Sequence, residues 1–558
     1  MKWFVLMWVS SFLSISYVTP SLGKPTSYLP LNHRAYDFLE IMENKYHITN
    51  EYSGTKPITR TEIASFLFSL EKKKTELTQV EKAELDCLLD EFRPDFFLQN
   101  QSALNNSEPI EILPDFFKSF VYRNHKNLYS SVGENYSLYF DPVIVRNASI
   151  GRVHETSKDD NVYTSSNGFI LRGTIGEHVG FHIDIRDSKE WGSREYPVKI
   201  TTTMPGRGYA TFKGDHAEFD ETFAHVCYTN GPFVIFYGRD RNVWGRGKKG
   251  TLALSSYGSP YDMARLETSF WHLKFVFFAA EIEQNPPVAR FYYNYPPGVF
   301  SDSVVVKKHM SGHRVEINIT DRLNLGFYET VVYGGRWDLS YLNPVMFLKG
   351  GEHTNFDHDN AVMGMDFRFL VRYGLSIYSE LLIDDMTTSK LGTDWYGNKI
   401  AYQLGTFYIE PFGLRDTDVR VEYSHINPWV YTHQFPINTY THYGDVLGHQ
   451  IGPNSDELSF EIRKRFSRRF HTAFSWSKRR HGADTEEKKV GGDPLEGFRQ
   501  GYSTKAKFLD GELEKTNTFG IDVSYELLWE LFLRIGYTYE NFNGNAMNTV
   551  RFSLGLNE

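Results

Sequence analysis

A two-residue alternation of apolar and polar side chains runs from about residue 116 to the end of the 558-residue chain. Near the C-terminus Leu533 and Ile535 fall on one face of a strand, and Arg534 and Gly536 fall on the other. This period predicts β-strands with one apolar face. The second face is charged or small in strand after strand, for example in His182, Asp184 and Arg186. It therefore meets either solvent, as in a β-sandwich, or a wet lumen, as in a transmembrane β-barrel.

Three features favour the barrel. Tight links such as 372–374 and 467–469 join neighbouring strands as hairpins, and aromatic residues such as Tyr537 and Phe542 recur near strand ends, which suits an interfacial girdle. The chain also carries an export signal, described next. We therefore predict an all-β, antiparallel transmembrane barrel. Its roughly 440 residues give about 18 strands at about 24 residues per strand and connection, and the connections are long on average because a spanning strand needs only about 9–11 residues. The chain departs from many such barrels by ending on Glu558 rather than on an aromatic residue.

The first 23 residues have the pattern of a secretory signal peptide. Met1-Lys2 is positively charged, residues 3–18 are apolar, and small residues precede a cleavage site after Gly23. An N-terminal anchor helix is the alternative. Beyond residue 23 no apolar run reaches the roughly 18 residues that a membrane-spanning helix requires. We therefore expect the mature protein in the outer membrane of a Gram-negative-type (diderm) bacterium.

Residues 24–115 are predicted to form a small α-helical periplasmic region ahead of the barrel at 116–558. Two capping boxes mark helix starts there, one from Thr59 to Glu62 and one from Thr78 to Glu81. Apolar residues follow each box at spacings of three and four, as in an amphipathic helix. Such short helices must bury their apolar stripes on one another or on a larger body.

Charge and cysteine content exclude several functional classes. The 60 basic and 69 acidic residues give a net charge of −9, which disfavours binding to nucleic acid. Two cysteines in so long a chain exclude a disulfide scaffold, and Cys87 and Cys227 are expected to be unpaired. We assign no cofactor, no metal and no catalytic residue. His353, Asp357 and their neighbours could bind a metal, but a solvated loop is the simpler interpretation.

The stretch from Gly238 to Gly250 combines arginine, tryptophan and glycine after a predicted strand. Guanidinium groups pair with carboxylates, and an indole stacks on a sugar ring, so this composition suits an acidic glycan. The alternative is a loop whose arginines pair with acids in the lumen. The glycan-binding candidates, which include two aromatic residues from a later tyrosine-rich stretch, are Arg239, Asp240, Arg241, Trp244, Arg246, Lys248, Trp429 and Tyr431.

Several segments resemble one family. Gly238-Arg239-Asp240-Arg241, Trp244-Gly245 and Gly250 to Ser255 are similar to the pattern G-R-D-R, W-G, G-x-L-x-L-S of Wzi-type capsule assembly proteins, and further matching segments lie at 341–344, 359–366, 381–385 and 422–433. The resemblance implies an outer-membrane barrel of about eighteen strands with a periplasmic helical bundle. It also implies a non-enzymatic lectin that holds capsular or exopolysaccharide at the cell surface.

A second, shorter resemblance lies in the helical region. Residues 33–36 and 56–63 look like a single S-layer-homology repeat, which implies contact with a cell-wall glycan. A plain packing role is the alternative for this stretch.

The leading hypothesis is therefore a surface protein that binds polysaccharide, with the polymer, outer-membrane lipid and either the export machinery or the cell wall as partners. A porin or sugar-transport channel has the same barrel with an open lumen. An outer-membrane hydrolase is a third hypothesis, for which the sequence displays neither a nucleophile nor a base.

Overall fold

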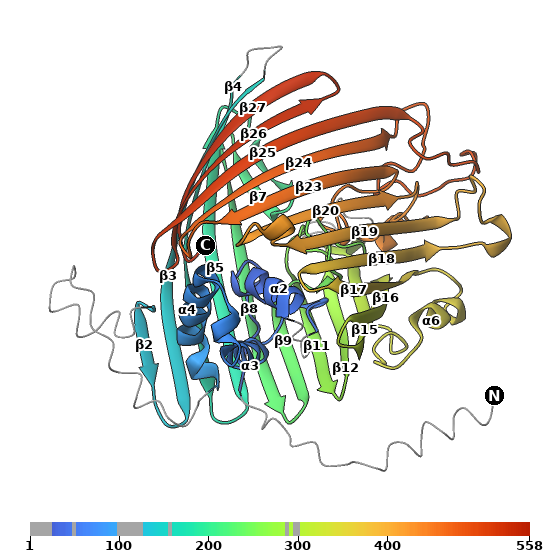
Figure 1. Ribbon diagram of the computed structural model, residues 1–558. Helices are drawn as coiled ribbons and strands as arrows, with labels where there is room; N and C mark the ends of the chain where they lie inside the picture. The colour runs from blue at the N-terminus through green and yellow to red at the C-terminus, as the bar shows by residue number, and fades with distance from the viewer. Residues whose placement is uncertain (1–24, 47–51, 97–125, 154–158, 285–289, 294–301) are drawn as a thin grey trace, which may run out of the picture.

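The computed structural model describes residues 25–46, 52–96, 126–153, 159–284, 290–293 and 302–558. Within these ranges eighteen antiparallel strands close into a barrel, as predicted (Figure 1). The last strand pairs with the first, with Phe552 opposite Ala148. The eighteen strands are β3 (Tyr136–Val153), β4 (Asp159–Ile175), β5 (Val179–Gly192), β8 (His216–Asn230), β9 (Phe233–Asp240), β11 (Tyr261–Phe270), β12 (Leu273–Ile282), β15 (Lys307–Thr320), β16 (Leu323–Gly335), β17 (Asn360–Arg372), β18 (Leu375–Asp385), β19 (Lys399–Ile409), β20 (Thr417–Ile426), β23 (Ser455–Arg465), β24 (Phe470–Ala483), β25 (Glu512–Leu528), β26 (Leu531–Phe542) and β27 (Asn545–Leu556).

Shorter strands extend the barrel sheet or form separate pairs. A short strand pairs with the start of β3, and a hairpin extends the sheet between β5 and β8. Three two-stranded pairings lie in the loops. The strand beside β3 is β2 (Tyr129–Val132), and the hairpin consists of β6 (Val198–Met204) and β7 (Gly208–Lys213). The three separate pairings are β1 (Thr55–Lys56) with β10 (Val243–Trp244), β13 (Arg290–Tyr293) with β14 (Asp302–Val305), and β21 (Thr441–His442) with β22 (Asp445–Val446).

The two ends of the barrel differ in the length of their connections. At one end short turns join the strands, such as the two residues between β8 and β9. At the other end lie long loops, including 241–260, 336–359 and 427–454. Short turns face the periplasm in outer-membrane barrels, and long loops face the outside. None of the helices in the described ranges is long and apolar enough to cross a bilayer.

The alternation predicted from the sequence separates the two faces of the wall. On β25 the outward-facing Phe519 and Ile521 are 42% and 51% exposed. The next residue, the inward-facing Asp522, forms an ion pair with Arg551 of β27, with 3.4 Å from the Arg551 Nη2 to the Asp522 Oδ1. Apolar side chains thus face lipid, and charged ones face the lumen.

Three N-terminal helices plug the barrel at its periplasmic end (Figure 1). They are α2 (Ala35–Tyr46), α3 (Arg60–Glu71) and α4 (Gln79–Phe96). Their apolar stripes form a core with Tyr378, Phe407 and Ile409 of the barrel wall. Both predicted capping boxes are present: the Thr59 and Thr78 side chains accept from the backbone of Glu62 and Glu81, whose carboxylates accept in return.

The S-layer-like stretch is part of this plug. Ile58 and Ile63 are buried in its core, and the Tyr36 hydroxyl donates to the carbonyl of Leu29. The proposed cell-wall contact of this stretch stays a prediction. The predicted signal peptide and residues 97–115 lie outside the described residues. Cys87 and Cys227 are free thiols, as expected.

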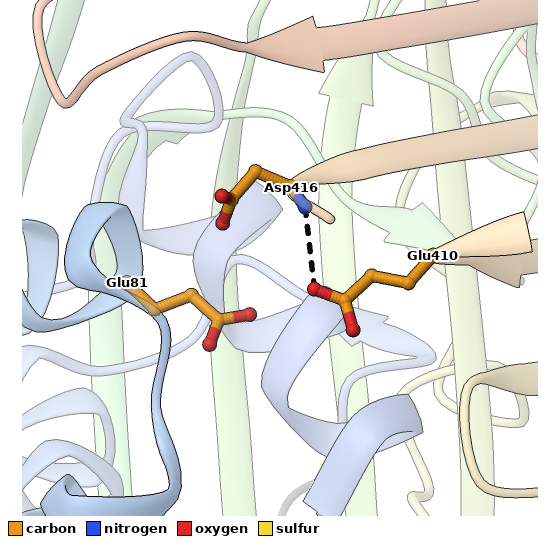
Figure 2. A group of neighbouring side chains, drawn as sticks. All are labelled: Glu81, Glu410 and Asp416. Atoms are coloured by element: carbon orange, nitrogen blue, oxygen red, sulfur yellow. Dashed lines mark hydrogen bonds between the residues drawn. The ribbon is translucent and has the colours of Figure 1, made fainter. Parts of the chain in front are cut away.

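An acidic group fixes the plug to a periplasmic turn of the barrel. Glu81 of α4 lies near Glu410 and Asp416 in the turn between β19 and β20 (Figure 2). The Lys45 ammonium is 2.7 Å from a carboxylate oxygen of Glu81 and 2.9 Å from one of Glu410. The Thr78 hydroxyl donates to Asp416 over 2.5 Å. Lys45 thus bridges Glu81 of the plug and Glu410 of the turn.

Docking of the plug is expected to weaken in acid. Arg420 of β20 donates to Glu40 of α2 over 2.8 Å. Burial acts to raise the pKa of Glu40, but Arg420 and Lys56 outweigh it and bring the pKa to about 2, from an ordinary 4.5. A carboxyl group with a lowered folded pKa stabilises the fold above its unfolded pKa, and this contribution disappears as the pH falls through the folded value. We expect protease access to α2 to be constant above about pH 5 and to rise between about pH 4.5 and 2.

The variant Glu40→Gln isolates this group from the other carboxylates. It is expected to lose part of the acid-dependent change, and its protease access above pH 5 should exceed that of the wild type. Identical pH profiles for the two proteins would contradict the assignment.

Candidate functional site

The loop 241–260 turns from the outer end of the barrel into the lumen and meets the plug. Its strand β10 pairs with β1 of the N-terminal region, with Trp244 opposite Thr55. Trp244 is fully buried, and its ring lies edge-on to Phe278, 5.5 Å between centroids. Glu380 of β18 accepts hydrogen bonds from the backbone of the loop at Leu252 and Ala253. The loop thus closes part of the lumen.

Arg246 lies in a buried charged network between this loop, the plug and the wall. Its guanidinium donates to the Ser53 hydroxyl over 2.7 Å and to the Asn324 side chain over 3.0 Å. It is also 3.4 Å from Glu316 and 3.8 Å from Glu43. These contacts match the alternative interpretation of the motif, in which its arginines pair with acids of the lumen.

Lys248 joins the loop to the first helix of the plug. Its ammonium is 2.8 Å from Asp37 of α2, and its backbone N–H donates to Glu422 of β20. Arg463 of β23 pairs with the other oxygen of Asp37, also at 2.8 Å. Burial acts to raise the pKa of Asp37, but the two cations outweigh it and hold the pKa well below its ordinary value. Lys248 is thus a link between loop, plug and wall.

Trp429 and Tyr431 are buried in the loop 427–454, which also folds into the lumen. The Tyr431 N–H donates to Asp384 over 2.7 Å, and its hydroxyl donates to the carbonyl of Leu252 in the loop 241–260. Trp429 stacks on Tyr502 at 6.0 Å. Gly491 approaches the Trp429 ring so closely that a Cβ would lie 2.5 Å from it, in a backbone conformation (φ +80°) that glycine favours. Both aromatic residues hold loops together.

The three residues at the start of the motif divide between the two faces of the wall. The outward-facing Arg239 pairs with Asp262 on the neighbouring strand, and its Nε is 2.9 Å from Asp262 Oδ1. Asp240 and Arg241 line a cavity in the lumen. The Arg241 guanidinium lies over the Phe223 ring, 4.9 Å from its centroid, and 4.0 Å from a carboxylate oxygen of Glu221. The eight candidates therefore do not form one surface.

Two adjoining cavities in the lumen meet at β5, and the smaller one is also lined by β8. The larger one, of about 1400 Å³, lies between the plug and the wall at the periplasmic end. The smaller one, of about 310 Å³, extends toward the loop 241–260 and includes Asp240, Arg241 and Ser256. His182, Asp184 and Arg186 line both. The cavities thus run side by side along one wall of the barrel.

Arg172 is a further cation on this wall. Its guanidinium lies 4.3 Å from the centroid of the Tyr139 ring. Among the described residues no carboxylate lies within 4.0 Å of it, whereas Arg186 pairs with Asp184 at 2.8 Å. The candidate residues chosen from the sequence did not include Arg172, Arg186 or His182. The alternation on β5 placed His182, Asp184 and Arg186 on one face, but only barrel closure brings that face beside Arg241.

The candidate metal residues of the loop 336–359 do not converge. His353 pairs with Asp357 on the exposed side of the loop, 2.6 Å apart, whereas Asp359 accepts from the Tyr341 hydroxyl. Asp384 and Asp385 are adjacent on β18 but lie in different environments. Asp384 is buried, whereas Asp385 is half-exposed.

The family model for capsule assembly protein Wzi matches residues 120–549 of this chain. No curated protein matches this chain. Among solved structures, Wzi from Escherichia coli, described as a carbohydrate-binding outer-membrane β-barrel involved in group 1 capsule assembly, superposes with a TM-score of 0.55 at 13% identity, over 95% of this chain and 99% of its own.

Two further barrels superpose over less of the chain. OccAB1 from Acinetobacter baumannii gives a TM-score of 0.42 at 9% identity, over 75% of this chain and 96% of its own. OprD from Pseudomonas aeruginosa gives 0.39 at 11% identity, over 74% and 92%. The family model covers most of the chain, including the motif at 238–250 and the barrel that surrounds it. The chain therefore belongs to the Wzi capsule assembly family.

Proposed function

We propose that this outer-membrane protein binds capsular or exopolysaccharide and holds it at the cell surface without breaking or forming bonds in the polymer. Membership of the Wzi family carries the proposal. The carbohydrate binding described for Wzi of Escherichia coli, which has the same fold, supports it. Export machinery, outer-membrane lipid and the cell wall remain predicted partners.

We infer that the polysaccharide contacts the cavity wall at Arg241 rather than the buried part of the motif. Trp244 and Arg246 are enclosed by protein, so their side chains are not available to a polymer. Arg241 lines a cavity, and Arg207 lies on the other side of Glu221, 3.2 Å from its carboxylate. Guanidinium groups of this kind bind the carboxylates of acidic sugars. Several weak contacts along one polymer together give a higher overall affinity.

The variant Arg241→Gln is expected to weaken polysaccharide binding by about 10-fold or more, because a hydrogen bond to a charged group contributes about 1.5–3 kcal/mol. The measurement is a titration of the refolded barrel with acidic polysaccharide from its own source organism. Arg239→Gln is the matched control, since Arg239 lies two residues before Arg241 and faces outward from β9. Its affinity should stay within about twofold of the wild type.

The outcomes separate the site from the function. Equal affinities for wild type, Arg241→Gln and Arg239→Gln would remove Arg241 from the site and leave the function standing. A wild-type protein that does not bind the polymer would overturn the function itself. Shortening of the polymer during incubation would contradict the non-enzymatic role.

The porin alternative requires a lumen open to small solutes. The loops 241–260 and 427–454 and the three helices occupy the part of the lumen bounded by β9 to β23. This filling favours a binding role over a channel. Conductance in a planar bilayer tests the distinction.

A further inference from the structure

The loop 336–359 packs on the outside of the barrel. It joins β16 to β17 and contains α6 (Leu348–Thr354), which lies beside these two strands and away from the helices of the plug (Figure 1). Its Tyr341 and Leu348 form a buried cluster with wall residues, and all five members are at most 3% exposed. The wall members are Val331, Tyr333 and Ala361, which alternate with the lumen-facing residues of β16 and β17. We call residues 336–359 the outer cover.

The wall beneath the outer cover is polar at a height where its neighbours are apolar. His313 of β15 lies opposite Glu329 of β16, with 3.1 Å from the His313 Nε2 to the Glu329 Oε2. In the same row of the sheet, Phe277 of β12 and Met363 of β17 flank this pair. Ionisable side chains on the lipid face of a barrel are strongly unfavourable within the hydrocarbon region. The pair therefore needs a cover.

The outer cover provides that shield through specific contacts. The backbone N–H of Leu348 donates to Glu329 over 2.9 Å. The Trp337 ring lies 4.2 Å from the imidazole of His309, the next outward-facing histidine along β15. Through these contacts His309 and Glu329 are both at least 90% buried.

The far side of the outer cover is apolar and exposed. Leu339, Val345 and Phe356 are each more than 80% exposed, and Phe347 is 59% exposed. Directly below, outward-facing side chains of the same strands continue the apolar surface, and these are Phe327, Met365 and Phe369. The exposed side is thus continuous with the lipid-facing belt of the barrel. Exposed apolar patches of this kind mark sites of interaction with membranes or proteins.

We propose that the outer cover is embedded in the outer leaflet, where its apolar side contacts lipid acyl chains and its polar side seals the His313–Glu329 pair from lipid. Continuity with the lipid-facing belt selects lipid as the occupant. The outer cover is then part of the membrane-contacting surface and does not hold polysaccharide.

Depth-dependent fluorescence quenching tests this proposal on the full-length barrel. A Val345→Cys variant in a Cys87→Ser background carries an environment-sensitive fluorophore, and the remaining Cys227 is fully buried. The protein is reconstituted in phospholipid vesicles with quenchers on the acyl chains. Phe369→Cys in the belt is the positive control, and Glu487→Cys on an exposed outer loop is the negative control.

Quenching at position 345 is expected to lie within twofold of that at 369 and to be several-fold stronger than that at 487. Quenching at 345 equal to that at 487 would overturn the proposal. Energy transfer between labelled copies together with weak quenching at 345 would also overturn it and would assign the surface to a second copy of the chain. None of these outcomes depends on polysaccharide binding.

Discussion

Replacing Arg314 by alanine is expected to lower the free energy of unfolding of the barrel by about 3–5 kcal/mol, the usual cost of removing one partner from a buried ion pair. Arg314 of β15 is fully buried in the lumen. It donates to Asp366 over 2.5 Å and to the Thr55 hydroxyl over 2.7 Å, and it lies 3.7 Å from Glu316. The variant leaves Asp366 without a countercharge and frees the β1 strand of the N-terminal region from the wall.

The protein is unfolded by urea or heat in detergent, and the folded fraction is measured from the band of the folded protein on a gel. Arg551→Ala is the matched control, because Arg551 also faces the lumen and pairs with an aspartate, Asp522, but both side chains are about half exposed. Exposed pairs contribute about 0–1 kcal/mol. A shift of similar small size in both variants would show that the Arg314 network does not hold the plug.

Replacing Trp244 by alanine is expected to release the loop 241–260 and to raise the conductance of the barrel several-fold. Removal of a buried tryptophan costs about 3–5 kcal/mol through lost packing and the cavity that remains. Trp244 touches Phe278 and Tyr328 and anchors β10 against β1, so this loss falls on the contact between loop and plug. The wild-type protein should show low conductance in a planar bilayer, because loop and plug fill this part of the lumen.

Trp271→Ala is the control, since Trp271 lies in the periplasmic turn between β11 and β12 and is 86% exposed. Its conductance should equal that of the wild type. A large, steady conductance in the wild-type protein would favour the porin alternative. Because Trp244 is enclosed, weaker polysaccharide binding in Trp244→Ala would report release of the loop rather than a lost contact, and only Arg241→Gln tests a contact directly.

Local patterns in the sequence predicted the helices and strands of the fold. The alternation along β5 and β25 and the capping boxes at Thr59 and Thr78 depend on residues a few positions apart, so each can be recognised in one segment. The strand number followed from the length of the strand-rich region.

The sequence by itself determined the strands with one apolar face and the helical N-terminal region, because the period of the side chains and the helix caps are set by neighbouring residues. The hairpin links, the aromatic residues near strand ends and the export signal then favoured a barrel over a sandwich. Only the tertiary structure decided which members of the motif face a cavity. Arg239 and Arg241 lie two residues apart, yet the strand ends between them, and Arg241 turns into the lumen. Arg246 and Glu43 are far apart in the chain and meet only because the loop and the plug enter the barrel from opposite ends. In that shared interior the side chains of Trp244 and Arg246 are enclosed by protein.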